Sequence, residues 1–322
     1  MSGPELWLGT VAFGRWGNPD RDQCVEIIRR AVDHGVTTLD TAASYADGEA
    51  EEIVGKAIAS CRDQVAIATK YGYDNATAGA TDLSTEALER SLDASLTRLG
   101  TDHVEVFFVH RVPATADRDA LAESMDALVR SGKTRAVGTS MTAERDLRAL
   151  HHAATSHGWA PLGWEQPPHS LFVRFVEDGI LSACQELGIR VSTFAPLNGG
   201  WLTGKYRRGA APPAGSRADS WPIRRDRFDH ERPEVARKLA LADELTTVAI
   251  SSGRTLEQLA LDFACSRPDV ASVIVGARTL DQLDDLLAHR RRPLEPEVAA
   301  AVDALVPAGT TVDEADVLGY RS

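Results

Sequence analysis

Four side chains in the first 110 residues have the types needed to move a proton: Asp40, Tyr45, Lys70 and His110. A tyrosine hydroxyl has an ordinary pKa of about 10, so it is a poor acid near neutrality unless its anion is stabilised. A nearby ammonium group stabilises that anion by Coulomb attraction in a partly desolvated pocket. This chemistry suits the reduction of a carbonyl, whose oxygen develops negative charge and must receive a proton.

Each of the four residues has a role in this hypothesis. Tyr45 is the acid, Lys70 is the cation beside it, and Asp40 holds Lys70 in place and keeps it charged. His110 donates a hydrogen bond to the carbonyl oxygen and stabilises its developing charge. A lone Asp or Lys is more often a salt bridge or a cap, and a lone His can be a core residue. No His, Cys and carboxylate cluster has metal-ligand spacing, so we expect no metal.

The elements that must position these residues form a regular series. Short apolar or β-branched runs recur, and an amphipathic segment follows nearly every one, for example the predicted helices 25–35 and 85–100, the second capped by Ser84. Several runs are apolar on consecutive positions, as strands covered on both faces require. The predicted strands span residues 5–9, 37–42, 64–70, 103–110, 134–140, 162–166, 190–196 and 271–277.

Eight strand-then-helix units favour an α/β fold, a closed (β/α)8 TIM barrel that forms one domain over residues 1–322. The rival is an open, doubly wound dinucleotide fold, which would carry G-x-G-x-x-G after the first strand. The sequence there, LGTVAFGRWG, does not fit that spacing. In a barrel, chemistry lies where strands end, and Asp40, Lys70 and His110 close strands two, three and four, with Tyr45 in the loop after strand two.

Composition sets the class of protein. The chain has 322 residues, of which 43% are hydrophobic and 25% charged, as in globular proteins. The net charge of −12 argues against general binding to nucleic acid or to an anionic membrane. The four cysteines lie far apart, there is no signal-peptide pattern, and no apolar run is long enough to span a membrane. We therefore expect a cytoplasmic protein with reduced thiols.

A long basic loop is predicted after strand seven, and a tail follows the last helices. Residues 201–232 contain eight Lys or Arg against four Asp or Glu. This loop lies on the catalytic side of a barrel. It is either a solvated connection or a flap that closes over anionic phosphates.

Seven segments resemble the aldo-keto reductase family, in order and across nearly the whole chain. They are TLDTAASYADGEAEEIVGKAI, AIATKYG, FFVHR, SGKTRAVGTS, EQPPHSLFVR, APLNGGWLTGKY and VIVGARTLDQL. In that family a tyrosine is the general acid, with Asp, Lys and His as partners. The resemblance assigns these roles to Tyr45, Asp40, Lys70 and His110.

The resemblance also implies a nicotinamide dinucleotide bound across the barrel mouth. Ser140 and Gln166 match residues that hold the carboxamide, and Phe194 matches the aromatic residue on which the nicotinamide ring stacks. An arginine at a helix N-terminus suits a phosphate, so Arg278 favours NADP(H), with NAD(H) as the alternative and a solvated arginine as the plainer interpretation. The residues matching the pyrophosphate loop and the adenosine 2′-phosphate segment are Pro196, Leu197, Gly199, Leu202, Lys205, Gly276, Ala277, Arg278 and Gln282.

Three residues depart from the family pattern near the cofactor. Met141 replaces an Asn that contacts the carboxamide, His169 replaces a Tyr, and Leu286 stands where an Asn often contacts adenine. The longer leading hairpin common in the family is also absent. Candidate substrate-facing aromatics are Trp16, Tyr71 and Tyr73, for which ordinary loop packing is the alternative.

The predicted function is reduction of an aldehyde or ketone by NADPH, or the reverse oxidation of an alcohol or sugar. A second interpretation is a regulatory subunit that keeps the fold and the nucleotide with little turnover, as channel-associated β subunits of this family do. A phosphate-handling isomerase on the same fold is a third. The expected partner is a small-molecule carbonyl compound, while its identity and the oligomeric state stay open.

Overall fold

The computed structural model describes residues 3–72, 81–220, 225–289 and 291–317. Eight strands close into a barrel in which every neighbouring pair is parallel, and β8 pairs with β1. This confirms the predicted (β/α)8 barrel. The strands are β1 Glu5–Gly9, β2 Thr38–Asp40, β3 Ala66–Tyr71, β4 Val104–Val109, β5 Thr134–Ser140, β6 Leu162–Gln166, β7 Arg190–Phe194 and β8 Ser272–Val275.

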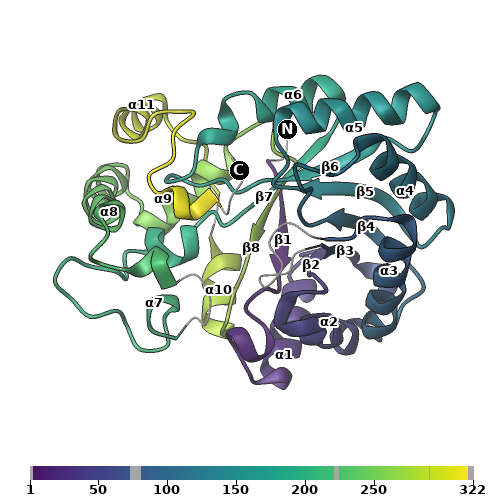
Figure 1. Cartoon of the computed structure of the whole chain (residues 1–322). Helices are drawn as coiled ribbons and strands as arrows, with labels where there is room; N and C mark the ends of the chain where they lie inside the picture. Colours follow the sequence, from purple (N-terminus) through teal and green to yellow (C-terminus); the bar gives the residue numbers. More distant parts are fainter. Residues whose placement is uncertain (1–2, 73–80, 221–224, 290, 318–322) are drawn as a thin grey trace.

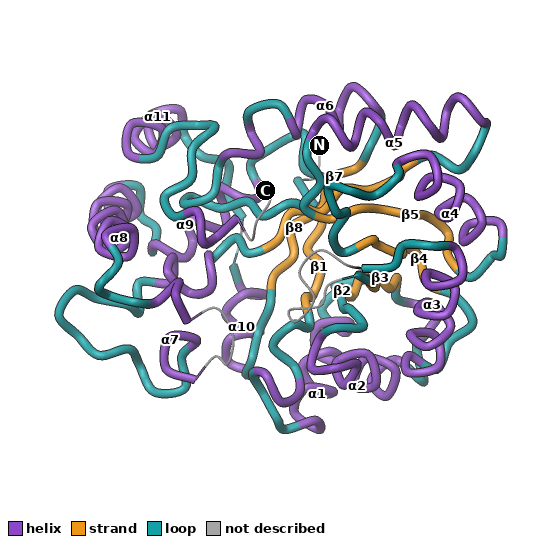
Figure 2. The backbone as a smooth tube through the Cα atoms, viewed as in Figure 1, coloured by secondary structure: helices purple, strands orange, loops and turns teal. Residues whose placement is uncertain are grey.

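Helices surround the strands, as Figures 1 and 2 show. Ser84 caps α3 by accepting a hydrogen bond from the Ala87 amide, and Gly100 ends that helix, as predicted. The helices are α1 Arg21–Asp33, α2 Glu49–Ile58, α3 Thr85–Leu99, α4 Arg118–Arg130, α5 Glu144–His157, α6 Ile180–Leu187, α7 Arg217–Ser220, α8 Pro233–Ser251, α9 Leu256–Cys265, α10 Leu280–Ala288 and α11 Pro296–Leu305.

The predicted boundaries need small corrections. The helix expected over residues 25–35 begins four residues earlier, because Asp20 accepts a hydrogen bond from the Gln23 amide and so caps α1. Strands two, seven and eight end earlier than predicted, because residues 41–42, 195–196 and 276–277 already belong to the loops at the barrel mouth. The basic segment after β7 is not a plain loop: it contains η5 (Asn198–Thr203), α7 and η6 (Arg225–Phe228).

Apolar side chains fill both the barrel and the layer around it. Inside the barrel, Trp7 and Trp164 pack with ring centroids 4.9 Å apart, beside Phe108. A larger core lies between the strands and the helices. A third cluster joins α8, α9, α11 and η5 around the buried Trp201. The barrel is therefore a packed core that presents functional groups only at its ends.

Candidate active site

The four predicted catalytic residues lie where β2, β3 and β4 end. Asp40 is the last residue of β2, and Tyr45 begins the short helix η2 (Tyr45–Gly48). Lys70 is the penultimate residue of β3, which ends at Tyr71, and His110 directly follows β4, so these two do not close their strands as predicted. The His110 amide donates to the Tyr71 carbonyl over 2.7 Å, which keeps the two strand ends together.

Lys70 is the centre of this group. Its Nζ donates to Asp40 Oδ1 over 2.6 Å, to the Thr41 carbonyl over 2.8 Å and to Tyr45 Oη over 3.2 Å. Lys70 is 0% exposed and Asp40 is 3% exposed, so the ion pair is shielded from water. The rings of Tyr45 and His110 meet edge to face with centroids 6.0 Å apart. The structure thus brings all four side chains together.

The backbone after Tyr45 is strained. Ala46 and Asp47 have φ values of 49° and 57°, in the left-handed region that residues with a Cβ rarely adopt. Gly48 follows with φ 91°, and a Cβ there would lie 2.7 Å from Cδ of Arg98. Such strain persists only where the surroundings enforce it, and it is concentrated at functional sites. Here it turns the chain sharply enough to keep Tyr45 over Lys70.

The electrostatic environment leaves Lys70 charged and His110 neutral. Burial alone would lower the pKa of Lys70, but the Asp40 carboxylate and Tyr45 outweigh it and raise that pKa above its usual value. Burial, followed by the positive charges of Lys70 and Arg111, lowers the pKa of His110 well below its usual value. Near neutral pH the site therefore holds a charged ammonium beside a neutral imidazole.

A polar group from the opposite side of the barrel completes this site. Gln166, at the end of β6, donates from Nε2 to Asp40 Oδ2 over 2.9 Å. Ser140, at the end of β5, donates its hydroxyl to the Gln166 carbonyl over 2.8 Å. Phe194 ends β7 and is half-buried. The three residues predicted to hold the nicotinamide thus end three consecutive strands, and Gln166 also orients the Asp40 carboxylate.

Four basic side chains gather beyond β7 and β8: Lys205, Arg217, Arg227 and Arg278, called here the cation group. A Cβ on Gly199 would lie 3.7 Å from Nη2 of Arg227 and 3.8 Å from Nη1 of Arg217. A Cβ on Gly200 would lie 2.7 Å from Nζ of Lys205. Arg278 donates from Nη2 to the Gly215 carbonyl, which places the segment around α7 beside the start of α10 (Figure 1).

The cation group fits an anionic ligand. Burial, together with the guanidinium groups of Arg227 and Arg278, lowers the pKa of Arg217 to about 10. Burial and the charges of Arg217 and Arg278 also lower the pKa of Lys205. Both shifts show that these charges repel one another in a partly desolvated place. Phosphate groups would relieve that repulsion, and the absence of a Cβ at Gly200 lets Lys205 lie against the backbone there.

The other predicted phosphate-binding residues fall in the same two turns. Thr279 caps α10 by accepting from the Gln282 amide, and the Gln282 side chain accepts from the Arg278 amide over 2.9 Å. Asn18 donates to the Arg278 carbonyl over 2.7 Å. The remaining predicted members form the turn after β7 or the end of β8: Pro196, Leu197, Leu202, Gly276 and Ala277.

The three departures from the family pattern have distinct surroundings. Met141 has a φ of 56° and is buried at the turn after β5. His169 is fully buried, stacks on Phe263 and shares a hydrogen bond of 2.8 Å with Glu177. Leu286 packs in the core beneath α10 at 6% exposed. The side chain that stands where the family often has an adenine-contacting Asn is therefore buried, and its effect on adenine recognition stays a prediction.

The two described candidate substrate residues, Trp16 and Tyr71, come from different elements at the barrel mouth. Trp16 lies in η1 (Gly14–Trp16), which contacts η2, the element that carries Tyr45. Tyr71 ends β3 and is half-buried, and burial raises its pKa. Tyr73 lies outside the described residues.

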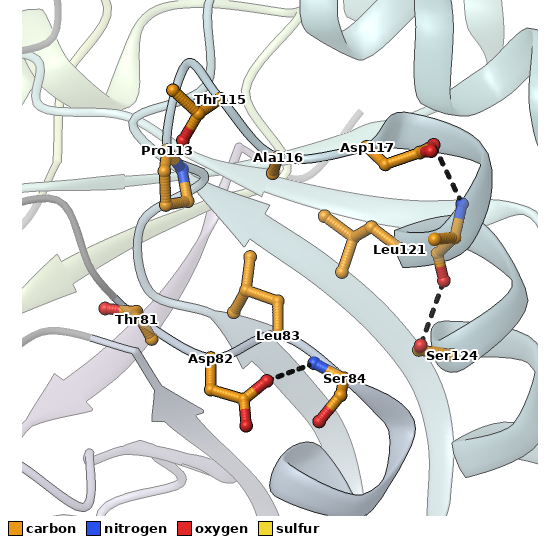
Figure 3. Close-up of a pocket in the computed structure, with 11 residues that line it drawn as sticks. Thr81, Asp82, Leu83, Ser84, Pro113, Thr115, Ala116, Asp117, Leu121 and Ser124 are labelled. Carbon is orange, nitrogen blue, oxygen red and sulfur yellow. Dashed lines mark hydrogen bonds between the residues drawn. The ribbon is translucent and has the colours of Figure 1, made fainter.

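A separate cavity of about 330 Å³ lies between the loops after β3 and β4 (Figure 3). Its two carboxylates are used locally: Asp82 accepts from the Ser84 amide, and Asp117 accepts from the Ala120 amide. None of the predicted catalytic or cofactor residues lines it. The cavity is therefore distinct from the cluster around Lys70.

Sequence reasoning did not assign several residues of this site. Arg217 and Arg227 belong to the basic loop for which the sequence predicts either a solvated connection or a flap over phosphates, without singling out either residue as a phosphate ligand. Asn18 carried no signal, because its contact with Arg278 joins residues 260 positions apart. The contact of Gln166 with Asp40 spans 126 positions and was equally hidden.

The family model of the aldo/keto reductases matches residues 5–307. A probable voltage-gated potassium channel subunit beta from Arabidopsis thaliana is 32% identical over 87% of this chain and 87% of its own. An L-glyceraldehyde 3-phosphate reductase from Escherichia coli O157:H7 is 32% identical over 87% of this chain and 83% of its own. A solved aldo/keto reductase from Klebsiella pneumoniae, in complex with NADP and acetate, superposes with a TM-score of 0.71 at 27% identity, over 95% of this chain and 92% of that one.

The chain belongs to the aldo/keto reductase family. Members of this family are oxidoreductases that use NAD(P)H. In the part of the chain that the structure describes, no helix is both long and apolar enough to cross a membrane.

Proposed function

We propose that this protein reduces an aldehyde or ketone to the alcohol with NADPH, and that Tyr45 is the proton donor. The observation that carries the proposal is the buried Lys70 ammonium, which is bonded to the Asp40 carboxylate and to the Tyr45 hydroxyl at once. The cation group supports the cofactor, and the membership of the family supports the reaction class.

NADPH, when bound, would supply the hydride that reduces the carbonyl carbon. As charge develops on the carbonyl oxygen, Tyr45 Oη gives it a proton, and the Lys70 ammonium stabilises the tyrosinate left behind. Asp40 keeps Lys70 charged and aimed at Tyr45. His110 is neutral, so it can donate a hydrogen bond to the carbonyl oxygen without adding a second positive charge beside Lys70.

The remaining residues position the reactants. Ser140 and Gln166 would hold the carboxamide, and the ring face of Phe194 would stack on the nicotinamide. Lys205, Arg217, Arg227 and Arg278 would hold the phosphates. Trp16 and Tyr71 would border the carbonyl compound at the mouth of the barrel.

The direct test measures NADPH consumption by the purified protein with a panel of aldehydes, ketones and keto-sugars that includes glyceraldehyde 3-phosphate. We expect turnover with at least one carbonyl compound. Tyr45→Phe should lower kcat by roughly 10²–10⁴-fold. Its dissociation constant for NADPH should stay within about twofold, because the hydroxyl acts on the substrate.

A second candidate is a nucleotide-binding regulatory subunit, which the likeness to the Arabidopsis channel subunit beta favours. Tight NADPH binding without turnover on any member of the panel would support this alternative. A Tyr45→Phe variant that keeps the wild-type kcat would instead show that another group donates the proton.

A further inference from the structure

The C-terminal tail, residues 306–317, is held against the rest of the molecule by backbone hydrogen bonds and ion pairs. The Val312 amide donates to the Phe172 carbonyl over 2.9 Å, and the Arg174 amide donates to the Thr310 carbonyl over 2.8 Å. Two carboxylates follow, Asp313 and Asp316, and both side chains are 0% exposed. The tail therefore brings two negative charges into the interior beside α8 and η6.

These carboxylates share one buried cation. Lys238 of α8 has its Nζ 2.9 Å from Asp313 Oδ2 and 2.7 Å from Asp316 Oδ2. Lys238 is also 0% exposed. A single ammonium cannot balance two buried carboxylates, and removing charges from water is costly unless they are paired. Each carboxylate accordingly has a second basic partner.

The second basic partners, Arg232 and Arg227, lie at different elements of the chain. Asp313 pairs with Arg232 at the start of α8, with 2.8 Å between Oδ1 and Nη2. Asp316 pairs with Arg227 of η6, with 2.7 Å between Oδ1 and Nε. Arg227 contacts Asp316 through Nε. Nη2 of the same guanidinium would lie 3.7 Å from a Cβ on Gly199, beside the other members of the cation group. Asp316 therefore contacts a member of the cation group, Arg227, whereas the arginine partner of Asp313 is Arg232, which is not in that group.

Arg227 needs such an anchor because its neighbours repel it. Arg217 lies on the same side of Gly199, and its lowered pKa reflects burial and the charges of Arg227 and Arg278. Without an opposing attraction, a guanidinium at the end of a flexible side chain would move away from such a group into solvent. The Asp316 carboxylate supplies that attraction, because its Oδ1 accepts a hydrogen bond of 2.7 Å from Nε of Arg227.

We propose that Asp316 is a positioning residue for the cofactor, which holds Arg227 against the phosphates of the bound dinucleotide and so fastens the segment after β7 to the tail. The proposal rests on the proposed function, because it takes the ligand of the cation group to be NADPH. It assigns the tail a role in how tightly and how long the cofactor is held.

The experiment compares Asp316→Asn with the matched variant Asp313→Asn. Each removes one buried carboxylate from Lys238, and only the first removes the partner of Arg227. NADPH affinity is measured by quenching of protein fluorescence, and release is measured by stopped flow. We expect Asp316→Asn to raise the dissociation constant on the order of tenfold, mainly through faster release. Asp313→Asn should stay within about twofold of wild type.

Arg227→Ala provides the second measurement. It should weaken NADPH binding as much as Asp316→Asn, and the double variant should be no weaker than Arg227→Ala alone, because both changes remove one interaction. If Asp316→Asn does not fold, Arg227→Ala is compared with Arg232→Ala, which removes the partner of Asp313 instead. Equal effects in that pair would refute the proposal.

Two outcomes distinguish this inference from the proposed function. If wild-type protein binds NADPH but Asp316→Asn and Asp313→Asn shift its dissociation constant equally, the tail has only a structural role and the inference is wrong. If the wild-type protein does not bind NADPH, the proposed function fails first, and the inference falls with it. Urea unfolding of each variant shows whether an equal shift reflects general loss of stability.

Discussion

At the scale of single residues, Lys70 and His110 show how burial gives two neighbouring bases different charges. Both are removed from water, which disfavours a positive charge on each. Lys70 recovers its charge because Asp40 lies 2.6 Å away. His110 has Lys70 and Arg111 beside it, so a second positive charge is opposed. Pairs of titratable groups whose environments separate their pKa values are typical of acid and base assignments in active sites.

The neutral state of His110 makes stability depend on pH. The unfolded imidazole takes a proton near pH 6.5, whereas the folded one resists protonation until much lower pH. The unfolded state then binds more protons, so the free energy of unfolding falls as the pH decreases through about 6.5. Between about pH 7.5 and 5.5 we expect wild type to lose roughly 1.4 kcal/mol more than His110→Gln, measured by urea unfolding.

The control for this prediction is His152→Gln, which changes an exposed histidine on α5. It should keep the pH dependence of wild type, because it leaves the buried His110 in place. If His110→Gln lost stability with pH as steeply as wild type, the imidazole would already be charged in the folded protein.

At the scale of elements, the turns that follow the strands store strain where the chemistry is proposed. Of the residues described, the non-glycine ones with positive φ all follow β2, β5 or β7: Ala46, Asp47, Met141, Ala195 and Asn198. Met141 and Ala195 come directly after β5 and β7, and the other three lie in the short helices η2 and η5 that follow β2 and β7. The packing of the barrel and its helices supports the cost of such conformations.

The start of α10 carries a prediction about the cofactor. Arg278 lies just before the helix N-terminus, where the backbone amides favour an anion. Arg278→Ala should raise the dissociation constant for NADPH by at least about tenfold and that for NADH by less, since NADH lacks the 2′-phosphate. Fluorescence titration of both cofactors measures the difference.

Arg148→Ala is the matched control, because Arg148 is an exposed arginine on α5 that pairs with Glu144 and Glu186. It should leave both affinities unchanged. Arg278 also holds the Gly215 carbonyl, so some loss for NADH is expected. If Arg278→Ala weakened the binding of both cofactors equally, Arg278 would act only through its contact with Gly215 and would not bind the 2′-phosphate.

At the scale of the whole molecule, the barrel interior leaves no space for larger side chains at its narrow points. Gly138 of β5 faces the interior, where an added Cβ would lie 2.6 Å from Cε1 of Phe108 and 2.9 Å from Cβ of Trp164. Both neighbours are buried and cannot move without disturbing the packed core. Gly138→Ala should therefore lower the free energy of unfolding by about 1–3 kcal/mol, as overpacking does.

Gly163→Ala on the adjacent strand β6 is the control for overpacking. There the new Cβ would lie 3.4 Å from the Val137 carbonyl oxygen and 3.6 Å from Cβ of Ala136, which are ordinary or nearly ordinary contacts. We expect its midpoint of urea unfolding to change much less. Equal destabilisation by the two variants would mean that strand conformation, and not interior packing, sets the cost.

The sequence by itself determined the barrel and the group around Lys70. Apolar runs covered on both faces require strands inside a layer of helices, and parallel strands must all end on the same side. Asp40, Lys70 and His110 fall within one residue of consecutive strand ends, so their proximity follows from local pattern and topology alone. Their roles as a proton-donating group remain a prediction that the proposed experiments test.

Only the tertiary structure decided which distant residues support that group. The contacts of Gln166 with Asp40 and of Arg227 with Asp316 join segments 126 and 89 residues apart. In the sequence, Arg227 is one of eight basic residues in the loop after strand seven, and nothing there links it to Asp316. The tertiary structure also places the Leu286 side chain in the core. A charge or an apolar residue acquires its role from the groups that share its desolvated space, and local periodicity carries no information about those groups.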